Sequence, residues 1–168
     1  KPENFAMSER AIPEPGEGEF LLRNMYLSME PAIRGWVDGK ANYFEPIPIG
    51  GVIRGPSVGQ VVKSCNQDFV EGDLVYALNH WEDYSICHSE AILLEKLKPE
   101  TGIPISYYVG SLGGAGATAY IGLHEVGQIQ AGQTVVVSAA AGATGSMAGQ
   151  IAKLCGCTGI GIVGRDKK

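Results

Sequence analysis

Apolar and polar residues alternate in short runs over the first hundred positions, and glycine and proline separate these runs. Residues 18–27 follow a Pro/Gly turn cluster and predict a strand, while residues 71–77 predict a turn leading into another strand. Residues 52–62 are typical of a strand broken by a bend, and residues 81–94 add further short strand-like runs. Several short strands punctuated in this way predict a small β-barrel.

The pattern changes in the second part of the chain. Residues 134–139 form a short run of β-branched apolar residues, which predicts a strand buried on both faces. Apolar residues at helical spacing over 147–154 predict a helix that ends at Gly156, and residues 158–164 predict a second strand. Together these segments predict one β-α-β unit, the opening of a doubly wound parallel sheet.

Glycine is unusually abundant, with 24 among 168 residues, and ten lie in residues 1–109 while fourteen lie in residues 110–168. This shift predicts a first domain over 1–110 and a second over 111–168. Residues 126–152 carry no charge, but five glycines and many polar side chains interrupt them, so no membrane segment is expected. The net charge of −5 also argues against nucleic acid and anionic membrane surfaces as partners.

The turn between the predicted strand and helix is rich in small residues. Gly142 lets the backbone approach a pyrophosphate, and Gly145 lets the helix pack closely on the strand. The amides at the helix start, including those of Ala143 and Thr144, then hold the anion. Ala140 replaces the first glycine of G-x-G-x-x-G, but the position between a buried strand and a helix still predicts dinucleotide binding.

The end of the second strand indicates which dinucleotide binds. An NAD site has a carboxylate here, whereas this chain has Gly164 followed by the cations Arg165, Lys167 and Lys168. Cations favour the 2′-phosphate of NADP(H), because each can donate a charge-assisted hydrogen bond. Two alternatives stay open: a solvated charged turn, and Asp166 acting as the ribose carboxylate.

The chain has four cysteines: Cys65, Cys87, Cys155 and Cys157. They form no C-x-x-C pair, which predicts reduced thiols in a cytoplasmic protein. Cys87 and His88 are adjacent and point to opposite faces of a strand, while His80 and His124 lack partners at ligand spacing. We therefore expect no metal site.

Three segments, in order, resemble a known family. Residues 139–145 resemble the A-x-x-G-x-x-G loop of the medium-chain dehydrogenase/reductases, and residues 112–120 resemble the segment that leads into their cofactor domain. Residues 26–36 are similar to the signature of a zinc-independent branch, which contains prostaglandin/leukotriene reductases, plant alkenal double-bond reductases and bacterial curcumin-type reductases. The resemblance runs from Pro2 to Lys168.

The resemblance implies a GroES-like, partly open β-barrel followed by a Rossmann domain. It also implies NADPH-dependent reduction of the carbon–carbon double bond of an α,β-unsaturated ketone or aldehyde, in a homodimer when full length. Leu27 and Gly55 align with the zinc ligands of the family's alcohol dehydrogenases, so the reaction is expected to proceed without zinc. One β-α-β unit is less than a Rossmann domain needs, and residues 1–5 match the family after its opening strand, so the chain is expected to be truncated at both ends and weakly active or inactive alone.

The resemblance also assigns roles to single residues. The loop from Gly142 to Gly145 would cradle the pyrophosphate, and Lys168 would meet the 2′-phosphate. Thr118 and Tyr120 would lie near the nicotinamide. Tyr43 matches a tyrosine of the substrate pocket and is the candidate catalytic residue, although it could equally be an ordinary half-buried aromatic. Two alternatives remain for the protein: a quinone oxidoreductase, and a non-catalytic nucleotide-binding or structural member of the superfamily.

Overall fold

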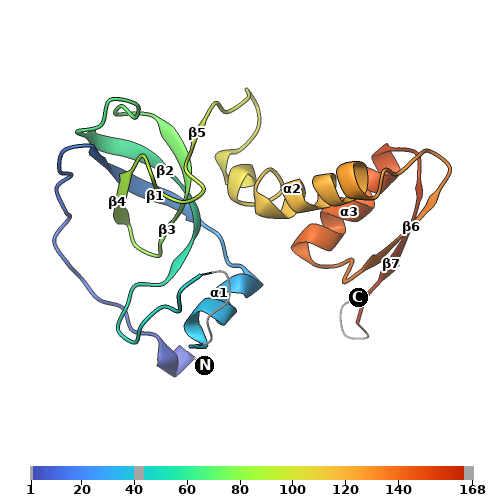
Figure 1. Ribbon diagram of the computed structural model, residues 1–168, viewed down its shortest axis with the longest axis horizontal. Coiled ribbons are helices and arrows are strands. Elements are labelled where there is room, and N and C mark those ends of the chain that lie inside the picture. The colour runs from blue at the N-terminus through green and yellow to red at the C-terminus, as the bar shows by residue number, and fades with distance from the viewer. Residues whose placement is uncertain (1, 40–43, 165–168) are drawn as a thin grey trace. The chain divides into compact units, whose positions relative to one another are not determined.

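The structure is a computed structural model that describes residues 2–39 and 44–164. It divides into two compact units, Lys1–Lys98 and Pro99–Lys168, drawn from blue to green and from yellow to red in Figure 1. Residue 110, where the glycine content changes, lies inside the second unit. Each unit has its own sheet.

The first unit is built on an antiparallel sheet. Its described strands are β1 (Glu19–Leu27), β2 (Arg54–Ser64), β3 (Leu74–His80), β4 (Tyr84–His88) and β5 (Glu95–Leu97). Its described helices are the 3-10 turn η1 (Pro2–Asn4) and α1 (Pro31–Val37). The strand order is β4-β1-β2-β3-β5, so β4 pairs with β1 across the sheet instead of with its sequence neighbour β3. Strands β1, β2, β3 and β4 all contribute side chains to one apolar core.

That core lies between the strands and the loop before β3. It consists of side chains that are less than a tenth exposed: Phe20, Leu22, Val61, Phe69, Val75, Ala77 and Cys87. The rings of Phe20 and Phe69 stack at 4.6 Å between centroids, which fixes the loop onto the sheet. The alternation of buried and exposed residues along β3 is the period-two pattern that the sequence shows.

The bend expected within residues 52–62 is wrong, because β2 runs without interruption through Gly55 and Pro56. The carbonyl of Pro56 accepts a hydrogen bond from the Ser28 amide at 2.7 Å, beyond the end of β1. Since the N–H and C=O of a strand residue point to the same side, the N–H that proline lacks would also face away from β3. Proline therefore costs the central strand no hydrogen bond to β3.

The second unit contains a parallel strand pair and helices. Its described elements are the 3-10 helix η2 (Ile105–Val109), α2 (Gly114–Ile121), the π-helical turn η3 (Gly122–Val126), β6 (Thr134–Ser138), α3 (Ala143–Leu154) and β7 (Thr158–Ile162). Strands β6 and β7 pair in parallel and α3 connects them, which confirms the expected β-α-β unit. Among the described residues, no helix is long and apolar enough to cross a membrane.

The expected burial of residues 134–139 on both faces is wrong. Val135 and Val137 are half-buried, but Val136 is 60% exposed, and Ile160 and Ile162 of β7 are 50% and 56% exposed. Among the described residues β6 pairs only with β7, and α3 covers one face of this pair, so no described element covers the alternate side chains.

Helix α3 ends as the sequence predicts. Gly156 follows the C-cap and has a φ of 76°, a left-handed conformation that glycine adopts without a steric cost. Its amide donates to the carbonyl of Lys153 at 3.0 Å, and the amide of Cys157 donates to the carbonyl of Ala152 at 2.9 Å. These two bonds satisfy carbonyls that the helix end leaves free, in the Schellman arrangement.

Candidate cofactor-binding site

The loop between β6 and α3 makes a tight turn. Ala139, directly after β6, has a φ of 50°, which is uncommon for a residue with a side chain. The amide of Gly142 donates to the carbonyl of Ala139 at 2.8 Å, and Gly142 is the N-cap of α3. The chain therefore reverses within a few residues and brings the helix start to the end of the strand.

Close backbone contact at Gly145 determines how near the helix comes. A Cβ atom at Gly145 would lie 2.4 Å from the carbonyl oxygen of Ala139 and 2.9 Å from the Cα of Ala140. Both neighbours are backbone atoms, so only glycine fits here. Gly161 of β7 has a similar role, because its Cβ would lie 2.9 Å from the Cβ of Ala140. The loop is thus held between α3 and β7.

The first turn of α3 offers unpaired donors. Within the described residues, no acceptor is found for the amides of Ala143, Thr144 and Gly145, and the first amide to bond back is that of Ser146, to the carbonyl of Gly142 at 2.9 Å. Gly142 has no side chain that could cap them, and the first turn holds no acidic residue. Three free amides at the positive end of a 12-residue helix suit a diphosphate group.

The loop is also tied to the end of the second strand. The amide of Ala140 donates to the carbonyl of Ile162, the last residue of β7, at 3.1 Å. Gly164 is exposed two residues later. A Cβ at Gly164 would meet nothing within 4 Å, so no described residue packs against this position. Arg165 and Lys168, expected at the 2′-phosphate, lie outside the described residues.

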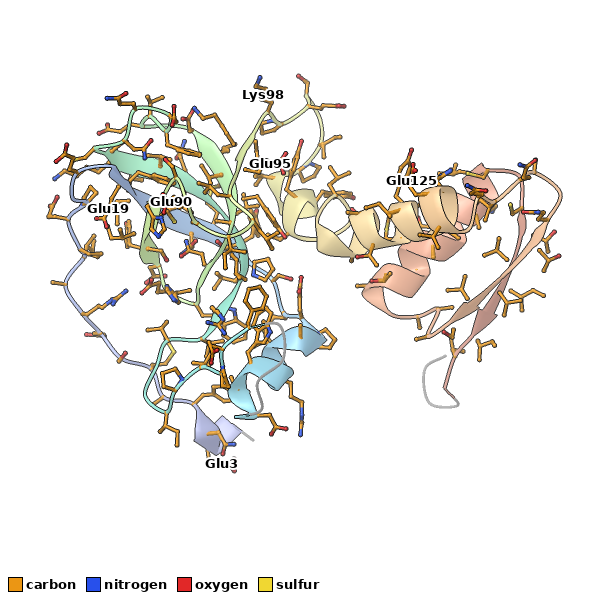
Figure 2. All side chains as sticks on the ribbon, in the orientation of Figure 1. Glu3, Glu19, Glu90, Glu95, Lys98 and Glu125 are labelled. Carbon is orange, nitrogen blue, oxygen red and sulfur yellow. The ribbon has the colours of Figure 1, made fainter. Side chains whose placement is uncertain are left out.

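Charge is scarce around this loop. From Gly110 to Gly164, the described part of the chain has only Glu125 and Lys153 as charged side chains. Figure 2 labels Glu125, which follows α2. A phosphate at the start of α3 therefore meets no carboxylate on the loop itself, and its binding depends on the amides and the helix dipole.

Thr118 and Tyr120, expected near the nicotinamide, lie on α2, which packs against α3. Both side chains are exposed. The ring of Tyr120 lies against the imidazole of His124 at 4.4 Å between centroids. A role for either residue at the cofactor stays a prediction.

Tyr43, the candidate catalytic residue, lies outside the described residues. The residue that follows it is well anchored, because the ring of Phe44 meets that of Trp36 edge-on at 5.3 Å. The guanidinium of Arg54 lies 5.5 Å from the Phe44 ring centroid and 5.7 Å from that of Trp36. This aromatic and cationic cluster fixes the chain directly after Tyr43.

The positions aligned with zinc ligands offer no ligand. Leu27 is aliphatic, and a Cβ at Gly55 would lie 3.0 Å from Nε1 of Trp81 and 3.1 Å from Cδ1 of Ile33, which leaves little room for a larger side chain. Among the described residues, there is no group of three or more His, Cys, Asp or Glu that could hold a metal ion.

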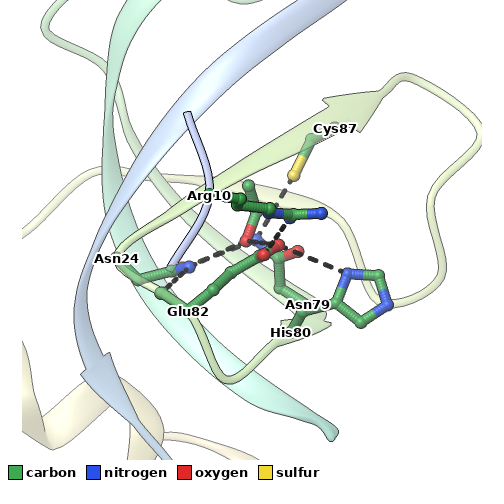
Figure 3. Close-up of polar contacts among 7 residues, drawn as sticks. Arg10, Asn24, Asn79, His80, Glu82 and Cys87 are labelled. Carbon is green, nitrogen blue, oxygen red and sulfur yellow. Dashed lines mark hydrogen bonds and ion pairs between the residues drawn. The ribbon is translucent and has the colours of Figure 1, made fainter. Parts of the chain in front are cut away.

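A polar network inside the first unit was not apparent from the sequence, because its members come from distant segments. Asn24 donates through Nδ2 to Ser85 Oγ and to the Glu82 carbonyl, both at 2.9 Å, and Ser85 donates to Glu82 Oε1 at 2.9 Å. Arg10 forms an ion pair with the same carboxylate (Figure 3). The network thus ties the amino-terminal segment to β1 and β4.

Cys87 is linked to the buried side of this network through Asn79, whose amide contacts both Asn24 and the Cys87 sulfur. Burial, with a smaller effect of Glu82, raises the pKa of its thiol to about 12, although a hydrogen bond from Asn79 at 3.5 Å acts in the opposite direction. The thiol is 3% exposed. Cys87 is therefore a structural side chain and not a nucleophile.

Comparisons with known proteins agree with this architecture. A family model described as the N-terminal domain of oxidoreductase matches residues 1–94. The NADPH-dependent curcumin reductase of Escherichia coli is 42% identical over 167 residues, an alignment that covers 99% of this chain and 48% of that protein. The 2-alkenal reductase (NADP(+)-dependent) of Nicotiana tabacum is 39% identical over 158 residues, covering 94% and 45%.

Among solved structures, CurA of Vibrio vulnificus in complex with NADPH has a TM-score of 0.86 and 44% identity, covering 99% of this chain and 48% of that one. The chain therefore spans about half the length of the relatives it matches. The expected fold class, a GroES-like barrel with the start of a Rossmann domain, is confirmed. The chain belongs to the oxidoreductase family defined by this N-terminal domain, in the zinc-independent branch of the medium-chain dehydrogenase/reductases.

Proposed function

We propose that the whole protein is an NADPH-dependent oxidoreductase that reduces the carbon–carbon double bond of small α,β-unsaturated ketones and aldehydes without zinc. The observation that carries the proposal is the uncapped first turn of α3, held against β6 by the close packing at Gly145. Relatives named as a curcumin reductase and a 2-alkenal reductase support the substrate class. The proposal includes a cytoplasmic homodimer.

In this proposal the chain's own residues bind and orient. The amides of Ala143 to Gly145 donate to the diphosphate, and Arg165 and Lys168 neutralise the 2′-phosphate beyond Gly164. Thr118 and Tyr120 border the nicotinamide ring. NADPH, when bound, supplies the hydride that the β-carbon of the substrate receives.

Tyr43 is the donor on the substrate side. Its phenol would donate a hydrogen bond to the carbonyl oxygen, where negative charge develops as the enolate forms. The packing of Phe44 against Trp36 would hold this part of the chain in place during the reaction. We therefore expect Tyr43→Phe to lower kcat of the full-length protein more than it changes the dissociation constant of NADPH.

The choice of cofactor is tested at Lys168. Lys168→Ala should raise the dissociation constant of NADPH about tenfold, the value of one charge-assisted hydrogen bond, while barely changing that of NADH. Lys153→Ala is the matched control, since this exposed cation lies in the last turn of α3 and should affect neither cofactor. Equal effects of Lys168→Ala on both cofactors would refute the 2′-phosphate role.

The reaction class is tested by NADPH oxidation with the full-length protein and a panel of enones, enals and quinones. Turnover of enones or enals with saturated carbonyl products supports the proposal. Turnover of quinones alone would replace it with the quinone oxidoreductase alternative. Tight NADPH binding without turnover of any of them would favour a non-catalytic member of the superfamily.

A further inference from the structure

Two side chains that the cofactor loop does not use meet in the second unit. The Sγ of Cys155 lies 3.7 Å from Nε2 of His124, although the two residues are 31 positions apart. Cys155 is the C-cap of α3 and His124 belongs to η3. Both residues are half-buried in the described chain.

We propose that Cys155 and His124 form a second, covalent site, at which the Cys155 sulfur adds to small α,β-unsaturated carbonyl compounds. The choice of these soft electrophiles as the natural ligand rests on the proposed function, because a protein that binds enals and enones meets them continually. The site itself rests on the contact between sulfur and imidazole and needs no NADPH.

The surroundings of His124 favour its role as a proton acceptor. With the proton of the neutral ring on Nδ1, Nε2 accepts the thiol proton from Cys155. The ring of Tyr120 lies beside the imidazole, tilted by 41° with 4.4 Å between the ring centroids, and helps to hold it in place.

The position of Cys155 makes it depend on this partner. The carboxyl end of α3 carries partial negative charge, which disfavours an isolated thiolate at its C-cap and favours a cation there. Lys153 lies in the last turn of α3, whereas His124 reaches Cys155 from η3. Loss of the thiol proton during the reaction therefore depends on the neighbouring His124, and removing His124 should slow the reaction of Cys155.

The other cysteines provide internal comparisons. Cys65 is the exposed thiol, and its sulfur lies 3.6 Å from the carbonyl oxygen of Pro15. Cys87 is 3% exposed with a pKa raised to about 12, and Cys157 is 8% exposed with its sulfur 3.2 Å from the carbonyl of Gln130. Exposure alone predicts that Cys65 reacts first, whereas the Cys155–His124 contact predicts that Cys155 does.

The chemical step is an addition and needs no oxidant or reductant. The thiol proton moves from Cys155 to Nε2 of His124, and the sulfur forms a bond to the β-carbon of the electrophile. The π electrons of the double bond shift to the carbonyl, giving an enolate. The proton held by His124 then passes to the α-carbon, so that the product is a saturated thioether carbonyl and His124 is neutral again.

The test treats the full-length protein with acrolein in the absence of NADPH and follows the adduct at each cysteine by peptide mass spectrometry after borohydride quenching. We expect Cys155 to react about tenfold faster than Cys65, and His124→Gln to lower the Cys155 rate about tenfold while leaving that of Cys65 unchanged. Cys65→Ser is the matched control and should leave the Cys155 rate unchanged.

The comparison of the two cysteines separates assistance by the imidazole from mere accessibility. In the unsubstituted protein Cys155 should react faster than the more exposed Cys65, and His124→Gln should bring the two rates close together. Faster reaction at Cys65, or a Cys155 rate that is unaffected by His124→Gln, would overturn the proposal. An adduct at Cys155 in a protein that reduces no enal would refute the proposed function while supporting this site.

Discussion

Replacing Gly145 by alanine should separate the helix from the strand at the start of the cofactor loop. The added Cβ would lie 2.4 Å from the carbonyl oxygen of Ala139, whereas ordinary contacts begin at 3.4 Å, so the backbone must move by about 1 Å. The nearest atoms are all backbone atoms of Ala139 and Ala140, and none can rotate away as a side chain would.

The steric cost of such overpacking is about 1–3 kcal/mol, partly offset by about 1 kcal/mol from the higher helix propensity of alanine. Gly149→Ala is the matched control on the same helix, because its Cβ would meet nothing within 4 Å and it gains the same propensity. The difference between the two variants therefore isolates the steric part, about 1–3 kcal/mol in the free energy of unfolding. The 1 Å displacement should also weaken NADPH binding about tenfold or more, because it loosens a hydrogen bond to a charged phosphate.

The free energy of unfolding is measured by urea denaturation with far-UV circular dichroism, which follows α2 and α3. Tryptophan fluorescence reports on the first unit, since Trp36 and Trp81 are the chain's two tryptophans. NADPH binding is measured by titration of cofactor fluorescence. If Gly145→Ala and Gly149→Ala have the same stability and the same affinity for NADPH, the close packing at Gly145 does not form the site.

Two further predictions concern other contacts. Gly161→Ala alone should lower the free energy of unfolding by about 1–2 kcal/mol. In an Ala140→Gly background the same substitution should cost much less, because the Cβ with which it clashes is gone. Additive effects in this double-mutant cycle, measured by urea denaturation, would contradict the contact. The pKa of Asp73 is lowered by its hydrogen bond from Lys96 and by that from the amide of Val70. A carboxyl with a lowered folded-state pKa stabilises the fold above its unfolded pKa and loses this effect as the pH falls through the folded value. Asp73→Asn should therefore lower stability at neutral pH and have little effect in acid, monitored by tryptophan fluorescence; a difference that does not vary with pH would exclude this charge effect.

Local patterns predicted the elements whose causes are local. Strand β1 follows from alternation after a turn cluster, and α3 follows from its apolar spacing. Its end at Gly156 follows from the left-handed conformation that a helix stop requires. The tight turn between β6 and α3 was likewise visible from its small residues, while its role in binding a cofactor stays a prediction.

Features that depend on distant residues were not predictable. The burial of β6 depends on how many strands flank it, which its own sequence does not encode. The bend expected near Pro56 is absent because the N–H that proline lacks would point toward β1, which ends before this position, and not toward β3. The contact of Cys155 with His124 joins residues with no ligand-like spacing, and only the packing of α2 and η3 against α3 brings them together.

The one departure of the loop from G-x-G-x-x-G is accommodated on the neighbouring strand. Ala140 stands at the first glycine position, yet the left-handed turn occurs one residue earlier, at Ala139, where it costs about 1 kcal/mol relative to glycine. The Cβ of Ala140 occupies the space that the absent side chain of Gly161 leaves free. The amide of Ala140 donates a hydrogen bond to the carbonyl of Ile162. A side chain at position 140 is therefore compatible with this loop only when position 161 has none. The G-x-G-x-x-G motif alone does not include this dependence of position 140 on position 161.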